Sequence, residues 1–302
     1  MERREFRRLG GLSHDTRAAI LFLLPFLVPY VAFKLWPIVH GFWISLHNWS
    51  SIGGSPTFVG AQNYERILQD ALFWRAFGNT VLFTGLATPT LIVLGMALAL
   101  ILNRKVPGGG LFRTLFYLPN MLSVSVISLI FVAVLTADSS GLVNNVLAAF
   151  GIEPISFLLN QQTAMPSIAL AAVWWTVGFN MLILLAGLQN IPSDVIDAAR
   201  VDGANTFQIF RRIMLPLAQP AIVTVGLLTF LAEWGALLKP LVFTTSDSMR
   251  TLQVGLNSFQ GELNTQWNLI LAMTVLTLLP ITLVFAFLQR YITSGIATTG
   301  MK

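Results

Sequence analysis

Six apolar stretches, each of roughly 20 residues or more, constrain the fold of this chain more than any other feature of the sequence. A helix needs about 20 consecutive apolar residues to cross the ~30 Å hydrocarbon core of a bilayer. The sequence therefore predicts an all-α membrane protein with six transmembrane helices, and it excludes a soluble or single-span protein. The predicted spans are Ile20 to Val39, Thr80 to Leu102, Tyr117 to Leu135, Ile168 to Leu188, Pro220 to Phe243 and Leu269 to Leu288.

The first stretch could also be the apolar centre of a secretory signal peptide, because it follows an arginine-rich start. No small-residue cleavage site closes it, and Pro37, Trp43 and Trp49 are typical of a retained helix that reaches the membrane interface. The composition agrees with this interpretation. The chain is 55% apolar and 10% charged, with a mean hydropathy of +0.73, as expected where lipid is the main solvent.

The distribution of basic residues predicts the orientation, because short cytoplasmic loops carry the excess of lysine and arginine. One side of the predicted membrane holds only Arg66, Arg75 and Arg250, while Lys34 and Lys239 lie near the outer ends of spans, where they can snorkel. Thirteen of the 18 basic residues fall on the other side: Arg3, Arg4, Arg7, Arg8, Arg17, Arg104, Lys105, Arg113, Arg200, Arg211, Arg212, Arg290 and Lys302. Because they are spread over separate short segments, they do not predict a nucleic-acid partner.

The charge count predicts a cytoplasmic tail at residues 1–17 and one transmembrane domain at residues 18–302. Both termini should be cytoplasmic. On the outer side, the segment from Val59 to Trp74 has helical spacing, with Tyr64, Ile67, Leu68 and Ala71 on one face, and it predicts a short surface helix. The loop at residues 137–163 contains no lysine or arginine, which agrees with an external position.

A carboxylate in the middle of the fifth span, Glu233, is the strongest polar outlier in the predicted membrane region. Placing such a group there costs about 3 kcal/mol even on the lenient insertion scale. Lys239 is six residues further on, off the same helical face, and is predicted to be a poor partner. Glu233 is therefore expected to face a cavity or a partner subunit, in preference to a structural ion pair or a protonated, packed group.

The loop at residues 191–216 predicts two short helices joined by a turn of small residues. Ser193 is predicted to cap the first helix, and Asp194 and Asp197 favour its positive end. Asp202 and Gly203 predict the turn. Asn205 and Gln208 predict a capping box for the second helix, which presents Phe207, Phe210, Ile213 and Met214 on one face and ends at Pro216. Such a loop either enters a cleft in another protein or only joins two spans.

The same loop resembles the EAA loop of importer-type ABC transporter permeases. The resemblance is carried by Asp197-Ala198-Ala199, then Asp202-Gly203-Ala204, then Phe210 and Leu215-Pro216, with Asp197 where the family usually has Glu. Further runs resemble the branch that imports maltose, lactose or glycerol-3-phosphate: VGAQNYERIL, FWRAFGNTVLFT, LFRTLFYLPNMLS, WWTVGFNMLILLAGLQNIP and SGIATTGMK. The resemblance covers about Ala18 to Lys302. Most of it favours the first of two paired permeases, whereas TLQVGLNSFQGE resembles the second.

The resemblance implies a type I ABC importer permease fold with a cytoplasmic coupling helix. It implies a heterodimer with a second permease, two ATPase subunits that bind ATP and Mg²⁺, and an extracytoplasmic solute-binding protein. The membrane would be the cytoplasmic or inner membrane of a bacterium or archaeon. The residues that would couple to the ATPase are Asp197, Ala198, Ala199, Asp202, Gly203, Ala204, Phe210 and Pro216. The residues that would line the solute pathway are Asn120, Ser123, Trp175, Thr176, Thr229 and Glu233.

The chain itself is not expected to be an enzyme. It lacks the G-x-x-x-x-G-K-[ST] phosphate loop, so the energy for transport would come from a partner or an ion gradient. It also lacks cysteine, H-E-x-x-H, paired mid-membrane aspartates and a Ser/His arrangement, so no cofactor, catalytic residue or metal site is predicted. A sugar, oligosaccharide or polyol is the expected solute. Glycerol-3-phosphate, a glycerophosphodiester and an ion-coupled secondary transporter remain alternatives.

Overall fold

Four long helices form the frame of the molecule. The computed structural model describes residues 14–49, 55–104, 107–244, 246–258 and 265–299, and of residues 14–18, 258 and 292–299 it describes the backbone only. Within this part, four helices are long and apolar enough to cross a membrane: Ala19–Ser45, α4 (Ala71–Asn103), α8 (Gln161–Gln189) and the Trp267–Tyr291 part of α15 (Trp267–Thr299). They confirm the first, second, fourth and sixth predicted spans, and each extends beyond the predicted stretch.

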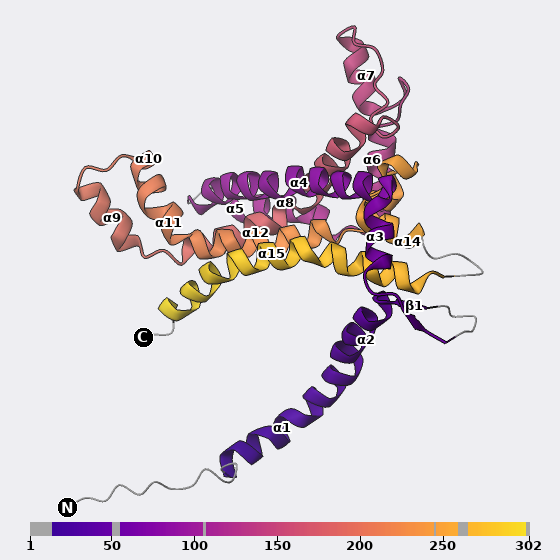
Figure 1. Cartoon of the computed structure of the whole chain (residues 1–302). Coiled ribbons are helices and arrows are strands. Elements are labelled where there is room, and N and C mark those ends of the chain that lie inside the picture. Colours follow the sequence, from indigo (N-terminus) through magenta and orange to yellow (C-terminus); the bar gives the residue numbers. More distant parts are fainter. Residues whose placement is uncertain (1–13, 50–54, 105–106, 245, 259–264, 300–302) are drawn as a thin grey trace, which may run out of the picture.

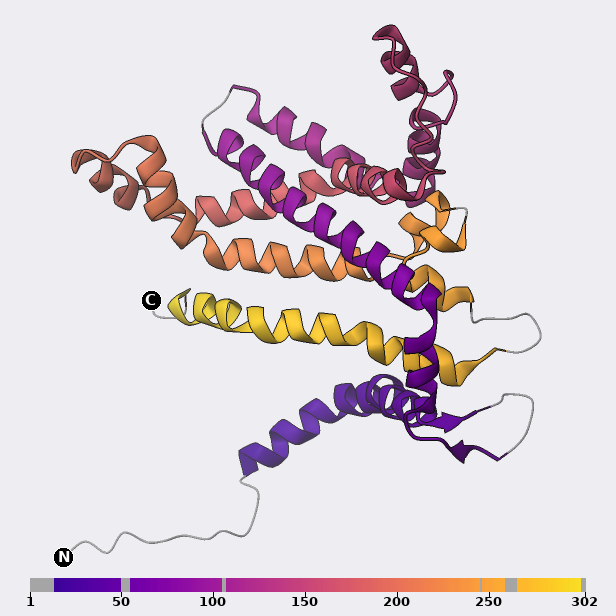
Figure 2. The ribbon, with the colours of Figure 1, turned by 45° about the horizontal axis from the view of Figure 1, so that its top comes forward.

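The N-terminal helix contacts the bundle through its second half and leaves it through its first. It consists of α1 (His14–Tyr30), a π-helical turn (Val31–Leu35) and α2 (Trp36–Ser45). The end of α2 packs against α15, where Gly41 lies next to Leu271, and α1 slants away from the bundle (Figures 1 and 2). All side chains from residue 19 to residue 39 are exposed. The π-helical turn lies directly before Pro37, whose missing N–H cannot continue the regular hydrogen-bond pattern. The predicted tail arginines at 3, 4, 7 and 8 lie outside the described residues.

The third predicted span, Tyr117 to Leu135, is wrong as a continuous helix. The chain instead forms α5 (Gly109–Tyr117), a 3₁₀ turn (Leu118–Met121) and α6 (Val124–Val134), with a bend of 96° between the two halves. Pro119 starts the break because it has no N–H to donate. Ser123 then begins a new helix, since its Oγ accepts a hydrogen bond from the Val126 backbone N–H.

The fifth predicted span, Pro220 to Phe243, is also broken. The helix α12 (Gln219–Trp234) ends at Gly235, and α13 (Leu238–Phe243) begins after a short link. A second bend, of 65°, separates α12 from the segment Thr206–Leu217 before it. The molecule therefore has four candidate spans of one helix each within the described residues, or up to six if each bent pair crosses as one span.

Close packing of α4, α8 and α12 builds the core. Met181 and Leu184 of α8 and Val225 of α12 are completely buried in one cluster with Ala99 of α4. Gly178 allows α8 to approach α5, since a Cβ there would overlap the carbonyl oxygen of Phe116. This contact fixes the position of the bend that follows α5.

The end of the molecule where α15 begins carries short elements (Figures 1 and 2). They are β1 (His47–Asn48), β2 (Thr57–Phe58), α3 (Gln62–Gln69), α7 (Leu142–Ala149), a 3₁₀ turn (Asp247–Met249) and α14 (Leu252–Ser258). Asn63 fastens α3 to the end of α2, because its Nδ2 donates to the carbonyl oxygens of Ser45 and His47 at 2.8 and 3.0 Å. The predicted surface helix is confirmed, and Ile67 is buried. Leu68 and Ala71 were predicted to share the face of Ile67, and this is wrong because both are exposed.

The segment that includes α7 projects beyond this end of the bundle (Figure 1). Buried Asn144 holds it together by donating to the carbonyl oxygens of Thr136 and Ile155 at 2.8 and 3.0 Å. Ser140 donates from its backbone N–H and its hydroxyl to the Asp138 carboxylate, and these bonds lower the pKa of Asp138 from its ordinary value. These bonds also fix the turn at residues 138–140 that leads into α7.

Candidate functional site

The first candidate site is the elbow, residues 191–216, which extends from the bundle at the end where α15 finishes (Figure 1). Its first helix is α9 (Ser193–Val201). The prediction that Ser193 caps this helix is wrong: Pro192 is the N-cap residue, and Ser193 is already helical, with its Oγ 3.4 Å from Asp194 Oδ1. Asp197 and Arg200 form an exposed ion pair of 2.8 Å on the helix surface.

The turn of the elbow has the predicted form. α9 stops at Asp202, and Gly203 adopts a φ of +83°, a conformation that side chains with a Cβ rarely adopt. Ala204 donates its N–H to the Ala199 carbonyl oxygen at 2.9 Å and closes the turn. The predicted capping box is confirmed, because Asn205 and Gln208 bond each other's backbone N–H at 2.9 Å in both directions.

The second helix of the elbow continues past the point where Pro216 was predicted to end it. It runs through α10 (Thr206–Ile209), a π-helical turn (Phe210–Met214) and α11 (Leu215–Leu217). The π-helical turn ahead of Pro216 accommodates its missing N–H, so the proline lies inside the helix. Of the predicted apolar face, Phe210, Ile213 and Met214 are half-buried, whereas Phe207 is 66% exposed.

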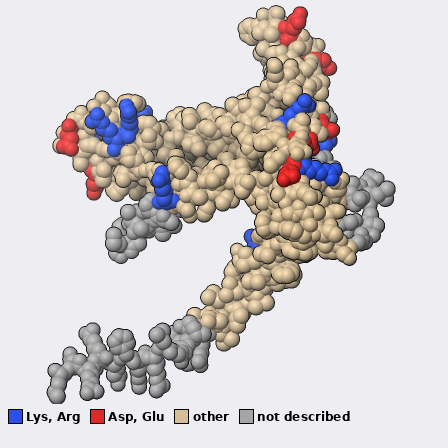
Figure 3. Space-filling model, viewed as in Figure 1, with Lys and Arg blue, Asp and Glu red and all other residues tan. Residues whose placement is uncertain are grey.

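The predicted coupling residues thus lie together on one exposed projection. Ala198, Asp202 and Gly203 are exposed, Ala204 is half-buried, and Ala199 is buried beneath them. Nothing larger than a methyl group stands at Ala198 or Gly203, so another surface can approach the backbone there. Figure 3 shows basic and acidic side chains together on the elbow, acidic side chains on the projecting segment that includes α7, and charges of both signs at the end opposite the elbow. The role of these residues in coupling stays a prediction.

The second candidate site is a cavity of about 250 Å³ among α8, α12 and the two helix breaks. Apolar side chains form most of its wall. Its polar side chains are Asn120, Thr176, Asn180, Thr229, Glu233 and Lys239. Four of the six residues predicted to line the solute pathway are therefore in one place.

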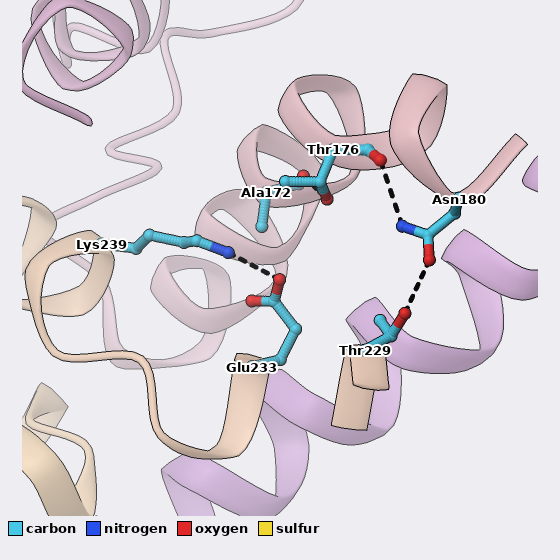
Figure 4. Close-up of polar contacts among 6 residues, drawn as sticks. All are labelled: Ala172, Thr176, Asn180, Thr229, Glu233 and Lys239. Carbon is cyan, nitrogen blue, oxygen red and sulfur yellow. Dashed lines mark hydrogen bonds and ion pairs between the residues drawn. The ribbon is translucent and has the colours of Figure 1, made fainter. Parts of the chain in front are cut away.

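Asn180 connects the two long helices that form this wall (Figure 4). Its Nδ2 donates to the Thr176 carbonyl oxygen at 3.1 Å, and its Oδ1 accepts from the Thr229 hydroxyl at 2.7 Å. The Thr176 hydroxyl donates to the Ala172 carbonyl oxygen at 2.8 Å. Because Thr229 and Asn180 are both buried, their hydrogen bond fixes α12 against α8. Sequence reasoning missed Asn180, although an amide in the middle of an apolar stretch was a detectable signal.

Glu233 and Lys239 form a buried ion pair of 2.6 Å (Figure 4). The side chains are only 2% and 16% exposed, so the prediction that Lys239 snorkels as a poor partner for Glu233 is wrong. The physical reason is the helix break: helical spacing keeps residues 233 and 239 apart, but α12 ends at Trp234, and α13 carries Lys239 back over the end of α12. Glu233 still lines the cavity, as predicted.

Two predicted pathway residues lie elsewhere. Ser123 caps α6 and does not line the 250 Å³ cavity. Trp175 faces a much smaller cavity on the other side of Lys239, whose Nζ lies 5.4 Å from the centre of the Trp175 ring. The resemblance to ABC permeases implied both positions, whereas in this chain the helix breaks near Pro119 and Ser123 begins α6.

One oxygen in the cavity lacks a partner. Glu233 Oε2 is buried and makes no hydrogen bond among the described residues, while Oε1 is taken by Lys239. A buried carboxylate oxygen without a donor costs free energy, so this atom favours a ligand that donates a hydrogen bond. No group of three or more His, Asp or Glu side chains within the described ranges is placed to hold a metal ion.

The comparisons with known proteins agree on one family. Residues 91–298 match the family model described as "binding-protein-dependent transport system inner membrane component". The chain is 35% identical over 209 residues to the trehalose/maltose transport system permease protein MalF of Thermococcus litoralis, covering 69% of this chain and 70% of that protein. It is 35% identical over 206 residues to the lactose transport system permease protein LacF of Rhizobium radiobacter, covering 67% and 68%.

The solved structures show the same fold. A chain of a bacterial alginate ABC transporter, solved with its alginate pentasaccharide-bound periplasmic protein, aligns with a TM-score of 0.76 at 20% identity, covering 91% of this chain and 94% of that one. A chain of the MetNI methionine ABC transporter aligns with a TM-score of 0.52 at 17% identity, covering 74% and 96%. The bent third and fifth spans are therefore found within a fold shared with ABC transporter permeases.

Proposed function

The chain belongs to the family of binding-protein-dependent transport system inner membrane components, the permeases of ABC importers, and from this premise we propose that it imports a neutral sugar or oligosaccharide by alternating access. As a permease it is a transport subunit and not an enzyme. The observation that carries the proposal is the cavity with the Glu233–Lys239 pair and the free Oε2 oxygen.

The chemistry of this cavity suits hydroxyl groups. Asn120 supplies donors and an acceptor, and Glu233 Oε2 supplies an acceptor for a sugar O–H. Lys239 is the only cation that lines the described part of the cavity, and the Glu233 carboxylate already neutralises it. A phosphorylated solute needs an unpaired arginine or lysine there. The cavity therefore favours a neutral solute over glycerol-3-phosphate or a glycerophosphodiester, and the named relatives transport maltose, trehalose and lactose.

A second permease is part of the proposal because the described part of this chain leaves the first half of its N-terminal helix uncovered. Every side chain from residue 19 to residue 39 is exposed, including Phe22, Phe33 and Trp36. Lipid can cover one side of such a helix, but Pro25, Pro29 and Pro37 give it a shape that suits packing against another protein. We propose a heterodimer in which the other permease contributes the second half of the pathway.

We further propose that the elbow docks on one of two ATPase subunits, which would bind ATP and Mg²⁺, and that a solute-binding protein delivers the sugar from outside. The basic residues at the end that carries the elbow support a cytoplasmic location for the elbow and both termini, in an inner membrane. The exposed, small-residue turn at Gly203 supports close docking.

Co-purification with the ATPase subunits tests the docking. Deleting Asp202 and Gly203 should abolish association with the ATPase while membrane insertion stays intact. Deleting Gly151 and Ile152 is the matched control, because it also removes a glycine with positive φ after a short helix, at the opposite end of the molecule. Uptake that persists without any ATPase subunit would refute the proposal.

A thermal-shift screen of the cognate binding protein against sugars tests the solute. We expect stabilisation by neutral sugars, since a ligand at 100 times its Kd adds about 2.7 kcal/mol of stability. Stabilisation by phosphodiesters alone would refute the choice of a neutral sugar and leave the importer assignment standing.

A further inference from the structure

Two hollows near the elbow lie next to each other. The first is an apolar groove of about 310 Å³ between α4, the second helix of the elbow and α12, with Val93, Ala97, Leu100, Phe210 and Ile222 among its lining residues. The second is a larger pocket of about 810 Å³ between the end of α4 and the elbow. Leu100 and Phe210 line both, so the groove and the pocket are neighbours.

The pocket has the polar groups that the groove lacks. Arg104, Arg200, Asn103 and Thr206 all line it, next to the aromatic ring of Phe207. Arg104 makes no ion pair among the described residues, and Arg200 uses only Nη1 to bind Asp197. Each guanidinium carries five N–H donors in a planar fork that fits the oxygens of a phosphate. Arg104 is therefore the cation that the pocket offers to an anion, while Arg200, whose charge Asp197 already offsets, can add N–H donors.

We propose that the groove and pocket together bind one anionic phospholipid, with its phosphate on Arg104 and Arg200 and an acyl chain along the groove. A free anion would use the pocket but not the groove, and a zwitterionic lipid would bring an ammonium group that offsets the charge of its phosphate, so an anionic phospholipid fits the site better. Arg104 follows directly on the last residue of α4, at the depth where a headgroup lies if α4 spans the bilayer. The lipid would come from the cytoplasmic leaflet, and this part of the proposal rests on the orientation given under the proposed function.

The position of the site gives the lipid a mechanical role. Arg104 and Leu100 belong to α4, which is packed into the core, whereas Arg200 and Phe207 belong to the elbow. A lipid that contacts both connects the elbow to the span beside it. The bound lipid would thereby restrict the position of the elbow and favour docking of the ATPase.

Native mass spectrometry of the complete transport complex tests the proposal, with dioleoyl phosphatidylglycerol and dioleoyl phosphatidylcholine as competing probes. We expect the complex to retain phosphatidylglycerol in preference. Arg104→Gln should weaken this retention about fivefold, because one basic residue near the headgroups contributes about 1 kcal/mol. Ala97→Phe should weaken it as well by filling the groove, while leaving the charge unchanged.

The double variant Arg211→Gln and Arg212→Gln is the matched control. Both arginines are exposed on the second helix of the elbow, and neither lines the pocket. We expect it to change retention less than Arg104→Gln does. A loss as large as or larger than that of Arg104→Gln would show diffuse attraction to basic residues and overturn the site. Displacement of the lipid by millimolar inorganic phosphate, or full retention in Ala97→Phe, would overturn the groove and show an anion site only.

The same spectra separate this proposal from the proposed function. Loss of the ATPase subunits from the wild-type complex would contradict the docking role of the elbow, whatever lipid is retained. Loss of phosphatidylglycerol selectivity in a complex that keeps its ATPase subunits would contradict the lipid site alone.

Discussion

Two ion pairs of similar length lie in the two candidate sites, and they differ in almost every other respect. In the elbow, Asp197 and Arg200 are 2.8 Å apart with side chains 63% and 66% exposed. In the cavity, Glu233 and Lys239 are 2.6 Å apart and 2% and 16% exposed. Water screens the first pair, whereas the second has lost most of its hydration and depends on its partner. Distance alone therefore does not indicate which region depends on its charges for stability.

The largest effect is expected from removing one member of the buried pair. Lys239→Met leaves the Glu233 carboxylate buried without a cation, and we expect the free energy of unfolding to fall by about 3–5 kcal/mol. Thermal unfolding of the purified protein in detergent measures the change.

Two controls sharpen this prediction. Glu233→Leu combined with Lys239→Met removes both charges and should recover most of the lost stability, although uptake should stay low. Arg200→Met breaks the exposed pair and should lower stability by less than about 1 kcal/mol. A double variant as unstable as Lys239→Met would mean that packing around Lys239, and not the unpaired carboxylate, causes the loss.

The same contrast explains what the sequence could predict. The turn at Gly203 and the capping box of Asn205 and Gln208 depend on residues within three or four positions, and both were predicted correctly. Local signals failed in the elbow only at Ser193 and Pro216, where Pro192 takes the cap position and a π-helical turn accommodates the proline.

The cavity depends on contacts between distant parts of the chain. Four of the six apolar stretches were confirmed as single helices long enough to cross a membrane, but apolar composition did not show where the other two break. The pairing of Lys239 follows from the break after Trp234, and the position of Ser123 follows from the break at Pro119. The hydrogen bond from Thr229 to Asn180 joins residues 49 positions apart, which no periodicity in a single stretch indicates.

Gly178 of α8 and Gly203 of the elbow differ in how closely other atoms approach their backbone, and an alanine at each position tests this difference. Gly178→Ala places a methyl group against the Phe116 carbonyl oxygen, and because backbone forms both sides of this contact we expect a loss of about 1–3 kcal/mol. Gly203→Ala in the elbow meets no atom within 4 Å and strains only its own φ of +83°, at about 1 kcal/mol. Thermal unfolding of the two variants gives the comparison.

Gly85→Ala is the control for this pair of variants. Gly85 lies inside α4 with nothing within 4 Å, so alanine should raise stability by about 0.5–1 kcal/mol. Equal losses at positions 178 and 85 would contradict the close approach of α8 to the end of α5.

The smallest effect on stability is expected at Asp197, where the effect on assembly should be the largest. Asp197→Ala removes one member of an exposed pair and should change the free energy of unfolding by less than about 1 kcal/mol. If the elbow docks on an ATPase through this carboxylate, association should weaken about fivefold or more, which corresponds to about 1 kcal/mol of binding free energy. The retained ATPase is measured after purification of the tagged permease at matched expression.

Asp247→Ala separates docking from the loss of an exposed ion pair. Asp247 bonds Arg250 at 2.9 Å with the same spacing of three residues, and it lies in the 3₁₀ turn at the end of the molecule opposite the elbow. Its removal should cost as little stability as that of Asp197, because both carboxylates are more than half exposed, and it should leave the ATPase bound. Equal losses of ATPase in the two variants would show that the carboxylate of the elbow has no special part in docking.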